Sequence, residues 1–78
     1  MREIVEVTPL ENYNLLLTFE NGEKRIKDMK PYLEKGIFKK LKDEQFFKTV
    51  KILYGAISWA GEIELCADSL YMDSEPID

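Results

Sequence analysis

Acidic and reactive side chains gather around the only tryptophan of the chain. In the stretch "ISWAGEIELCADSLY", residues 57–71, the carboxyl groups of Glu62, Glu64 and Asp68 accompany the single cysteine, Cys66. Glutamates two positions apart on a strand point to the same side, so with Asp68 they can hold a hard cation such as Mg²⁺ or Ca²⁺. No ligand loop of recognised spacing is present. The pattern therefore favours a solvated acidic strand face over a metal site.

The inventory for catalysis is poor. The chain contains no histidine, which removes the usual general base near neutral pH and the commonest zinc ligand. No lysine or arginine lies near Cys66 in the sequence to favour its thiolate form, so we expect a small, partly buried apolar residue there. The glycines are scattered and form no phosphate-binding loop. We expect no catalytic residues, no bound cofactor and no metal, and hence not an enzyme.

Trp59 and Tyr71 admit two interpretations. Exposed aromatic side chains anchor protein interfaces, whereas a small domain needs its largest side chains in the core. Core packing is favoured for both. The partner-binding hypothesis instead takes a surface made of Trp59, Glu62, Glu64, Asp68 and Tyr71.

The first third of the chain reads as three strands. Ile4, Val5 and Val7 supply β-branched residues in a run that ends at Pro9. Over residues 13–19, every second side chain (Tyr13, Leu15, Leu17 and Phe19) is apolar and shares one face, and Leu16 indicates that the other face is also partly covered. Asn21-Gly22 predicts a hairpin with a type I′ turn, in which both residues take positive φ. The charged return strand, residues 23–28, is expected at a sheet edge, with its lysines and its arginine exposed in some mixture.

The middle of the chain predicts short helices. Pro31 lies near a helix start and Gly36 where that helix would stop. Asp43 is placed to cap a further helix over residues 44–48, which implies a break near Lys42.

The last third returns to strand. Residues 50–54 alternate, Gly55 marks a bulge or bend, and residues 57–59 and 63–65 flank a tight turn at Ala60-Gly61. Ile57, Trp59, Ile63 and Leu65 are expected on one face of this hairpin, with Ser58, Glu62, Glu64 and Cys66 on the other. Asp68 is expected to cap a helical turn, and residues 72–78 to form a frayed polar tail. The prediction is a single α+β domain over residues 1–78: an antiparallel sheet with an N-terminal three-stranded meander, central short helices and a C-terminal hairpin.

Composition places the chain among cytoplasmic proteins. Its 78 residues are 45% hydrophobic, enough for one small core. A single cysteine forms no internal disulfide, which fits a reducing compartment. The N-terminal residues lack the apolar core of a signal peptide, and the longest strictly apolar run, Leu15–Leu17, is far shorter than a membrane span. We therefore expect a soluble cytoplasmic protein with no membrane partner.

Charge is strongly segregated along the chain. Residues 24–51 hold ten basic side chains against four acidic ones, whereas residues 52–78 hold six acidic side chains and no basic one. Such a dipole steers a charged partner by long-range attraction. Alternatively, the two segments lie side by side and neutralise each other. The net charge of −4 argues mildly against nucleic acid as the partner.

The ordered motifs resemble a known family. The hairpin "YNLLLTFENGEKRIKDMKPYL", the helical part "GIFKKLKDEQFF" and the closing "WAGEIELCADSLY" are similar to the bacterial domain-of-unknown-function family 2442. The resemblance implies a small α+β domain with an antiparallel sheet and no established catalytic residues. It also implies a gene arrangement similar to toxin–antitoxin pairs, with another small uncharacterised protein encoded beside the domain. Some members carry an added C-terminal helix-turn-helix domain, which these 78 residues lack.

Two functional hypotheses follow. The first is a non-enzymatic protein-interaction module, the antitoxin-like partner of a small basic protein, which meets that protein through its acidic last third. The alternative is a nucleic-acid-associated regulatory protein that uses the basic central helices, through Lys35, Lys39, Lys40 and Lys42. Self-association, in which an exposed edge strand pairs across a two-fold axis, stays open as well.

Overall fold

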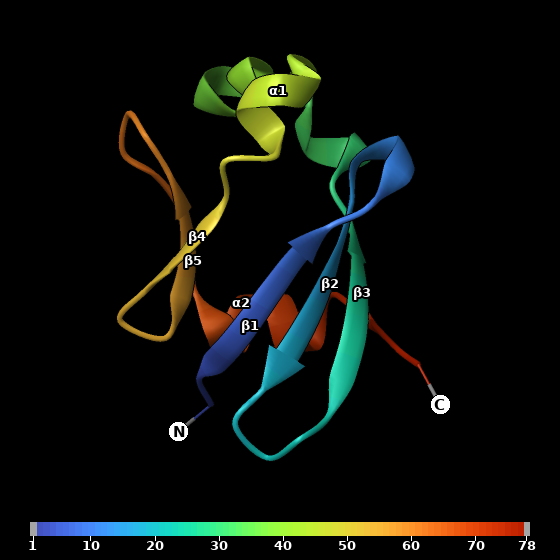
Figure 1. Ribbon diagram of the computed structural model, residues 1–78. Helices are drawn as coiled ribbons and strands as arrows, with labels where there is room; N and C mark the ends of the chain where they lie inside the picture. Colours follow the sequence, from blue (N-terminus) through green and yellow to red (C-terminus); the bar gives the residue numbers. More distant parts are fainter. Residues whose placement is uncertain (1, 78) are drawn as a thin grey trace.

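Two antiparallel sheets face one another in the computed structural model, which describes residues 2–77. Figure 1 shows a layer of short helices over one end of the sheets, and α2 lies near the other end. Sheet A contains, in spatial order, β1 (Ile4–Pro9), β2 (Asn14–Phe19), β3 (Lys24–Asp28) and β7 (Glu75–Pro76). Sheet B contains β4 (Lys51–Leu53), β5 (Ala56–Trp59) and β6 (Ile63–Leu65). The α+β class and the N-terminal meander are confirmed.

The helices are all short. Three are 3₁₀ helices: η1 (Glu11–Tyr13), η2 (Lys30–Tyr32) and η3 (Gly36–Lys42). The α-helices are α1 (Glu44–Phe47) and α2 (Ala67–Met72). Within residues 2–77, none of them is long and apolar enough to cross a membrane.

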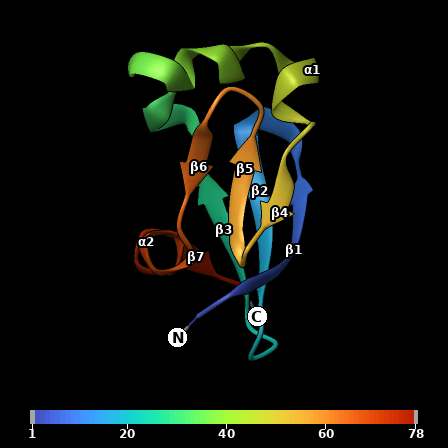
Figure 2. The same cartoon turned by 90° about the vertical axis from the view of Figure 1, so that its left-hand side faces the viewer.

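The core lies between the two sheets. Leu15, Leu17 and Phe19 alternate along β2 and are fully buried, as the period of a strand requires. Figure 2 shows sheet B in front of sheet A, and the buried side chains of β5 and β6 belong to the same cluster. Leu41 of η3 and Phe47 of α1 close one end of this core, and Leu70 of α2 joins it as well.

The hairpin turns differ from their predicted types. Between β2 and β3, Gly22 has a φ of 89°, but Asn21 is not in the left-handed region, so the type I′ prediction is wrong. The Asn21 side chain accepts a hydrogen bond from the Glu23 N–H at 2.9 Å, which favours a three-residue loop with a glycine bulge. The type I′ pattern occurs instead at Tyr54 and Gly55, with φ of 51° and 77°, where we expected a bulge or bend.

Strand β3 points charged side chains inward, which the sequence did not predict. Arg25 lies opposite Leu17 and Lys27 opposite Leu15, so both share the core-facing side of sheet A. Lys27 is only 6% exposed. Ile26 pairs with Leu16 on the other side of the sheet.

The C-terminal end of α2 explains these inward charges. Arg25 donates to the Ser74 carbonyl at 2.7 Å, and the Lys27 ammonium to the Asp73 carbonyl at 3.4 Å. Asp73 is the C-cap of α2, where carbonyl groups carry partial negative charge and favour cations, and Ser74 lies one residue beyond it. The expectations of a frayed tail and of an edge position for β3 are both wrong, because β7 pairs with β3.

One predicted cap is confirmed and one is wrong. Asp43 accepts a hydrogen bond from the Gln45 N–H at 3.0 Å and begins α1, after the predicted break at Lys42. At α2, however, the N-cap position belongs to Cys66. Asp68 therefore lies inside the first turn and pairs with Arg2 at 3.7 Å. Cys66 is exposed, contrary to the expectation of partial burial. Gly36 begins η3 and does not end a helix.

Candidate functional site: the outer face of sheet B

The side of sheet B that faces away from the core carries exposed residues, Lys51, Leu53 and Glu64, around Ser58, which is only 5% exposed. Ile52, Ile57 and Leu65 pair in one row, and the complete burial of Ile57 marks that row as core-facing. Successive side chains of a strand point to opposite faces, so the side chains in the rows on either side of this one must point outward. Figure 2 looks onto this outward side, and no helix lies across β4, β5 and β6. We call it the outer face of sheet B; it carries Lys51, Leu53, Ala56, Ser58 and Glu64.

Trp59 takes no part in this outer face. It is 1% exposed and lies in the core between the sheets. Its indole N–H donates to the Phe47 carbonyl at 2.9 Å, and the two rings are 6.1 Å apart. Trp59 therefore fastens β5 to α1, and the core-packing interpretation of this residue is confirmed.

Tyr71 and Asp68 connect α2 to residues in the first third of the chain. The Tyr71 hydroxyl donates to the Glu23 carboxylate at 2.7 Å, and the guanidinium groups of Arg2 and Arg25 lie 4.1 and 4.3 Å from its ring centroid. The hydrogen bond from Tyr71, followed by that from Arg25, lowers the pKa of Glu23 below its usual value. The Tyr71 hydroxyl and ring therefore already have partners within the chain.

Three of the predicted partner-binding residues, Glu62, Glu64 and Asp68, are exposed, and of these Asp68 pairs with Arg2. Glu62 has a φ of 68° and lies in the turn before β6, so the expected pair on one strand face does not form. Neither glutamate has an ion-pair partner among residues 2–77. In the same part of the chain, no group of three or more acidic or cysteine side chains is placed to hold a metal ion.

Sequence reasoning missed the most exposed aromatic side chain. Tyr54 is 95% exposed at the tip of the β4–β5 hairpin. Leu53 beside it and Val5 of β1 are also exposed. The signal was present, because Tyr54-Gly55 separates two alternating strands by two residues, as a tight hairpin requires.

The comparisons with known proteins agree with the motifs of the sequence. A family model described as "Protein of unknown function (DUF2442)" matches residues 4–76. The chain belongs to this family. Neither the curated proteins nor the solved structures give a match to it. The matched residues of this DUF2442 domain include both sheets, so the outer face of sheet B lies within the family's own domain.

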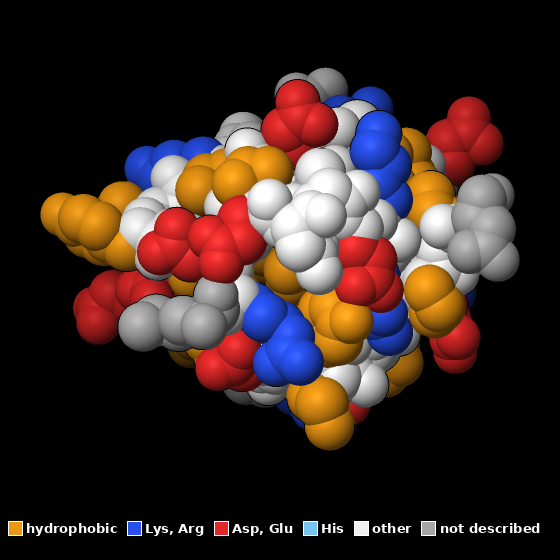
Figure 3. Space-filling view, turned by 90° about the horizontal axis from the view of Figure 1, so that it is seen from below, with side chains coloured by type: hydrophobic (Ala, Val, Ile, Leu, Met, Phe, Trp, Pro, Cys, Tyr) orange, Lys and Arg blue, Asp and Glu red, His pale blue; other side chains and the backbone are white. Residues whose placement is uncertain are grey.

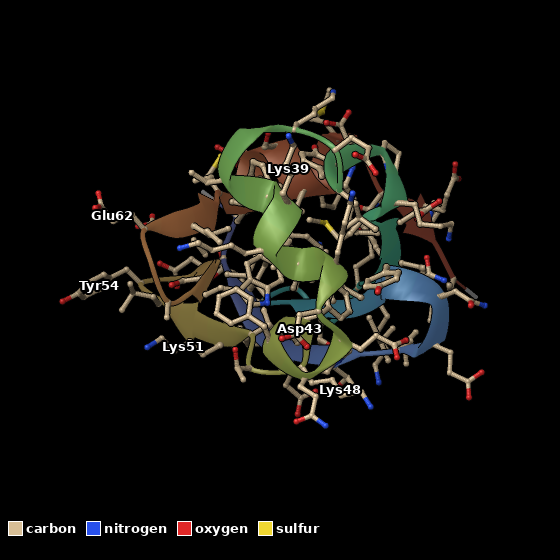
Figure 4. The ribbon with its side chains drawn as sticks, turned by 90° about the horizontal axis from the view of Figure 1, so that it is seen from above. Lys39, Asp43, Lys48, Lys51, Tyr54 and Glu62 are labelled. Atoms are coloured by element: carbon tan, nitrogen blue, oxygen red, sulfur yellow. The ribbon has the colours of Figure 1, made fainter. Side chains whose placement is uncertain are left out.

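Basic side chains of the DUF2442 domain also gather on η3, and Lys40 reaches the turn that carries Glu62, where a Cβ added at Gly61 would lie 3.1 Å from its Nζ. Lys39, Lys40 and Lys42 are exposed on η3 above the sheets, and Figure 4 looks down on this layer. Lys42 pairs with Glu34 at 2.7 Å, and this contact lowers the pKa of Glu34. Within residues 2–77, no ion pair joins the basic segment 24–51 to the acidic residues after it. Contact pairing therefore does not neutralise the two segments.

A hollow of about 580 Å³ lies between η1 and α1. Tyr13 and Phe47, which line it, pack edge-to-face with ring centroids 5.3 Å apart. The charged residues that line it are of both signs: Glu11, Glu44 and Lys48. This mixture does not select a ligand of one charge, in contrast to the carboxylates near β6.

Proposed function

We propose that this DUF2442 domain is a non-enzymatic protein-interaction module that binds a small basic protein through the outer face of sheet B. The observation that carries the proposal is the exposure of Glu62 and Glu64, without ion-pair partners in residues 2–77, beside a sheet face that no helix covers. The antitoxin-like gene arrangement implied by the family resemblance is consistent with such a partner.

Electrostatics supply the physical reason. Carboxylates that form no ion pair within residues 2–77 keep much of their field in the surrounding water and accelerate encounters with a cationic surface. The net charge of −4 adds to this attraction. The outer face of sheet B carries one basic and one acidic side chain, Lys51 and Glu64, and Glu62 in the adjoining turn adds the excess negative charge that favours a cationic partner.

The test is the salt dependence of association. The purified domain serves as bait in an extract of the cells that produce it, and the recovered protein is identified and purified. We expect the association rate to fall about tenfold between low and moderate salt, because screening removes electrostatic steering. A double variant, Glu62→Gln with Glu64→Gln, is expected to lose most of this salt dependence.

Glu20→Gln is the matched control, because Glu20 is exposed on the β2–β3 hairpin of sheet A. This variant should retain the salt dependence of the unmodified domain. An association rate that does not change with salt, or a recovered partner without a basic surface, contradicts the proposal.

The alternative function is a nucleic-acid-associated regulatory protein. The exposed ammonium groups of Lys39 and Lys40 on η3, which form no ion pair within residues 2–77, would contact phosphates together with Lys35 and Lys42. A gel shift with duplex DNA and with single-stranded RNA at low salt tests this alternative. Binding that Lys39→Gln and Lys40→Gln weaken supports it, whereas the absence of any shift at low salt contradicts it.

A further inference from the structure

We infer that Tyr54 is the aromatic anchor of the interface on the outer face of sheet B, and that it enters an apolar cleft rimmed by cationic side chains on the basic partner. The inference rests on the proposed function and adds to it the residue that fixes the partner in place. Its first support is exposure: Tyr54 is 95% exposed. Its side chain forms no hydrogen bond and no aromatic pair within residues 2–77. The fold gains little from an aromatic side chain at this position.

The backbone at Tyr54 provides the second support. Its φ of 51° is left-handed, and the following Gly55 has a φ of 77°. Asparagine, aspartate and glycine are preferred at both positions of such a turn, since other side chains crowd the backbone. Tyrosine is therefore strained here, and residues held in sparse backbone conformations cluster at functional sites.

The turn that carries Tyr54 is fastened to the start of β1. The Ile4 N–H donates to the Gly55 carbonyl at 2.8 Å, which fastens the hairpin tip to the start of β1. The Glu3 side chain packs so closely on Gly55 that an added Cβ would lie 2.8 Å from its Cγ. An aromatic side chain on a preorganised backbone loses little conformational entropy on binding, which is the property of an interface anchor.

Neighbouring side chains indicate the chemistry of the partner. Leu53, which precedes Tyr54, is exposed, and Val5, which is 52% exposed, follows Ile4, whose N–H bonds to the Gly55 carbonyl. Glu3 lies against Gly55, and Glu6 is exposed farther along β1. In Figure 3, hydrophobic side chains lie beside acidic ones at the left margin, the side of sheet B.

The distribution of charge selects a basic partner over a second copy of the chain. Figure 4 shows Tyr54 and Glu62 projecting from the same side of the molecule, and Figure 1 shows that the β4–β5 and β5–β6 turns that carry them lie at opposite ends of sheet B. A partner for this side needs an apolar cleft with lysine or arginine at its rim. A second copy docked by the same patch would bring like carboxylates together, which is unfavourable.

The test combines a cross-link with an affinity ratio. The full chain carrying the photoreactive residue p-benzoylphenylalanine at position 54 is expressed in its own cells and irradiated, and the adduct is identified by mass spectrometry. The cross-linked protein is then purified, and its dissociation constant is measured for Tyr54→Asn, Tyr54→Phe and Met72→Ala. Met72 is the control because it is an exposed apolar side chain on α2.

We expect Tyr54→Asn to weaken binding at least about tenfold, as the loss of an anchor residue does. The same variant should melt at the same or a higher temperature, because asparagine suits the left-handed turn. This combination separates an anchor from a structural residue. Tyr54→Phe and Met72→Ala should bind as the unmodified chain does.

Three results would overturn the inference: no adduct, an adduct with a second copy of the chain, or unchanged affinity of Tyr54→Asn. If salt and the Glu62 and Glu64 variants still alter association when Tyr54→Asn does not, the proposed function stands and only the anchor is wrong. If neither set of variants alters association, both fail.

Discussion

Some aromatic and acidic side chains of this protein hold the fold together, whereas others are exposed to solvent. Trp59 is buried and its indole N–H is hydrogen-bonded to the Phe47 carbonyl, whereas Tyr54 is exposed to solvent at a strained turn. Glu23 is held by Tyr71 and Arg25, whereas Glu62 has no ion-pair partner within residues 2–77. The internally bonded residues stabilise the fold, and the exposed ones are free to meet a partner.

Glu23 should make stability depend on pH on the acid side. Its pKa in the folded chain lies below the ordinary value of 4.5, through the Tyr71 hydroxyl first and then Arg25. The carboxylate therefore stabilises the fold above pH 4.5, and this contribution is lost as the pH falls through the folded pKa. We expect Glu23→Gln to melt at a lower temperature than the unmodified chain at neutral pH.

The difference in melting temperature should shrink as the pH falls below 4.5. Thermal unfolding followed by circular dichroism over an acidic pH series measures it. Glu20→Gln, on the same hairpin, is the control and should melt with the unmodified chain at neutral pH. A difference for Glu23→Gln that is constant over the whole series would show that the hydrogen bonds do not favour the ionised form.

Short elements depend on their boundaries for stability, because they have few internal hydrogen bonds. Helix α1 is four residues long and begins at a side-chain cap from Asp43. Helix α2 begins at Cys66 without such a cap, and Arg25 and Lys27 bind carbonyls at its other end. Two aspartates that look alike in the sequence, Asp43 and Asp68, therefore stabilise their helices to different extents.

Replacing each aspartate by alanine measures this difference. We expect Asp43→Ala to lower the free energy of unfolding by about 1 kcal/mol, the usual cost of a lost N-cap. Asp68→Ala removes an exposed contact with Arg2 and should cost less than about 0.5 kcal/mol. Urea denaturation of both variants gives the comparison. Equal losses would show that Asp43 does not act as a cap.

The two ends of the chain are joined through sheet A. Arg25 binds the side chain and the carbonyl of Ser74, and β7 pairs with β3 beside it. The N-terminal Arg2 also contacts Tyr71 and Asp68 of α2. These polar contacts hold the last ten or so residues against a sheet formed by the first third of the chain.

Removal of the Arg25 guanidinium should release this C-terminal segment. We expect Arg25→Ala to accelerate amide hydrogen exchange in residues 70–77, above all at Ile77, whose N–H donates to the Lys24 carbonyl at 3.1 Å. Lys30→Ala, which removes an exposed pair with Asp28, should leave exchange in this segment unchanged. Exchange that accelerates equally in all elements would indicate global destabilisation and would contradict a local role of Arg25 in holding the C-terminal segment.

Local patterns were sufficient to predict several features of this protein. The alternation of β2, the Asp43 cap and the break at Lys42 depend on neighbouring residues alone, and the structure confirms them. The inward Arg25 and Lys27 were not predictable, because their partners lie nearly fifty residues away at the end of α2. The exposure of Tyr54 and the burial of Trp59 likewise depend on how the two sheets face each other. Local sequence specifies backbone conformation, whereas solvent access and the pairing of charges arise only when distant segments pack together.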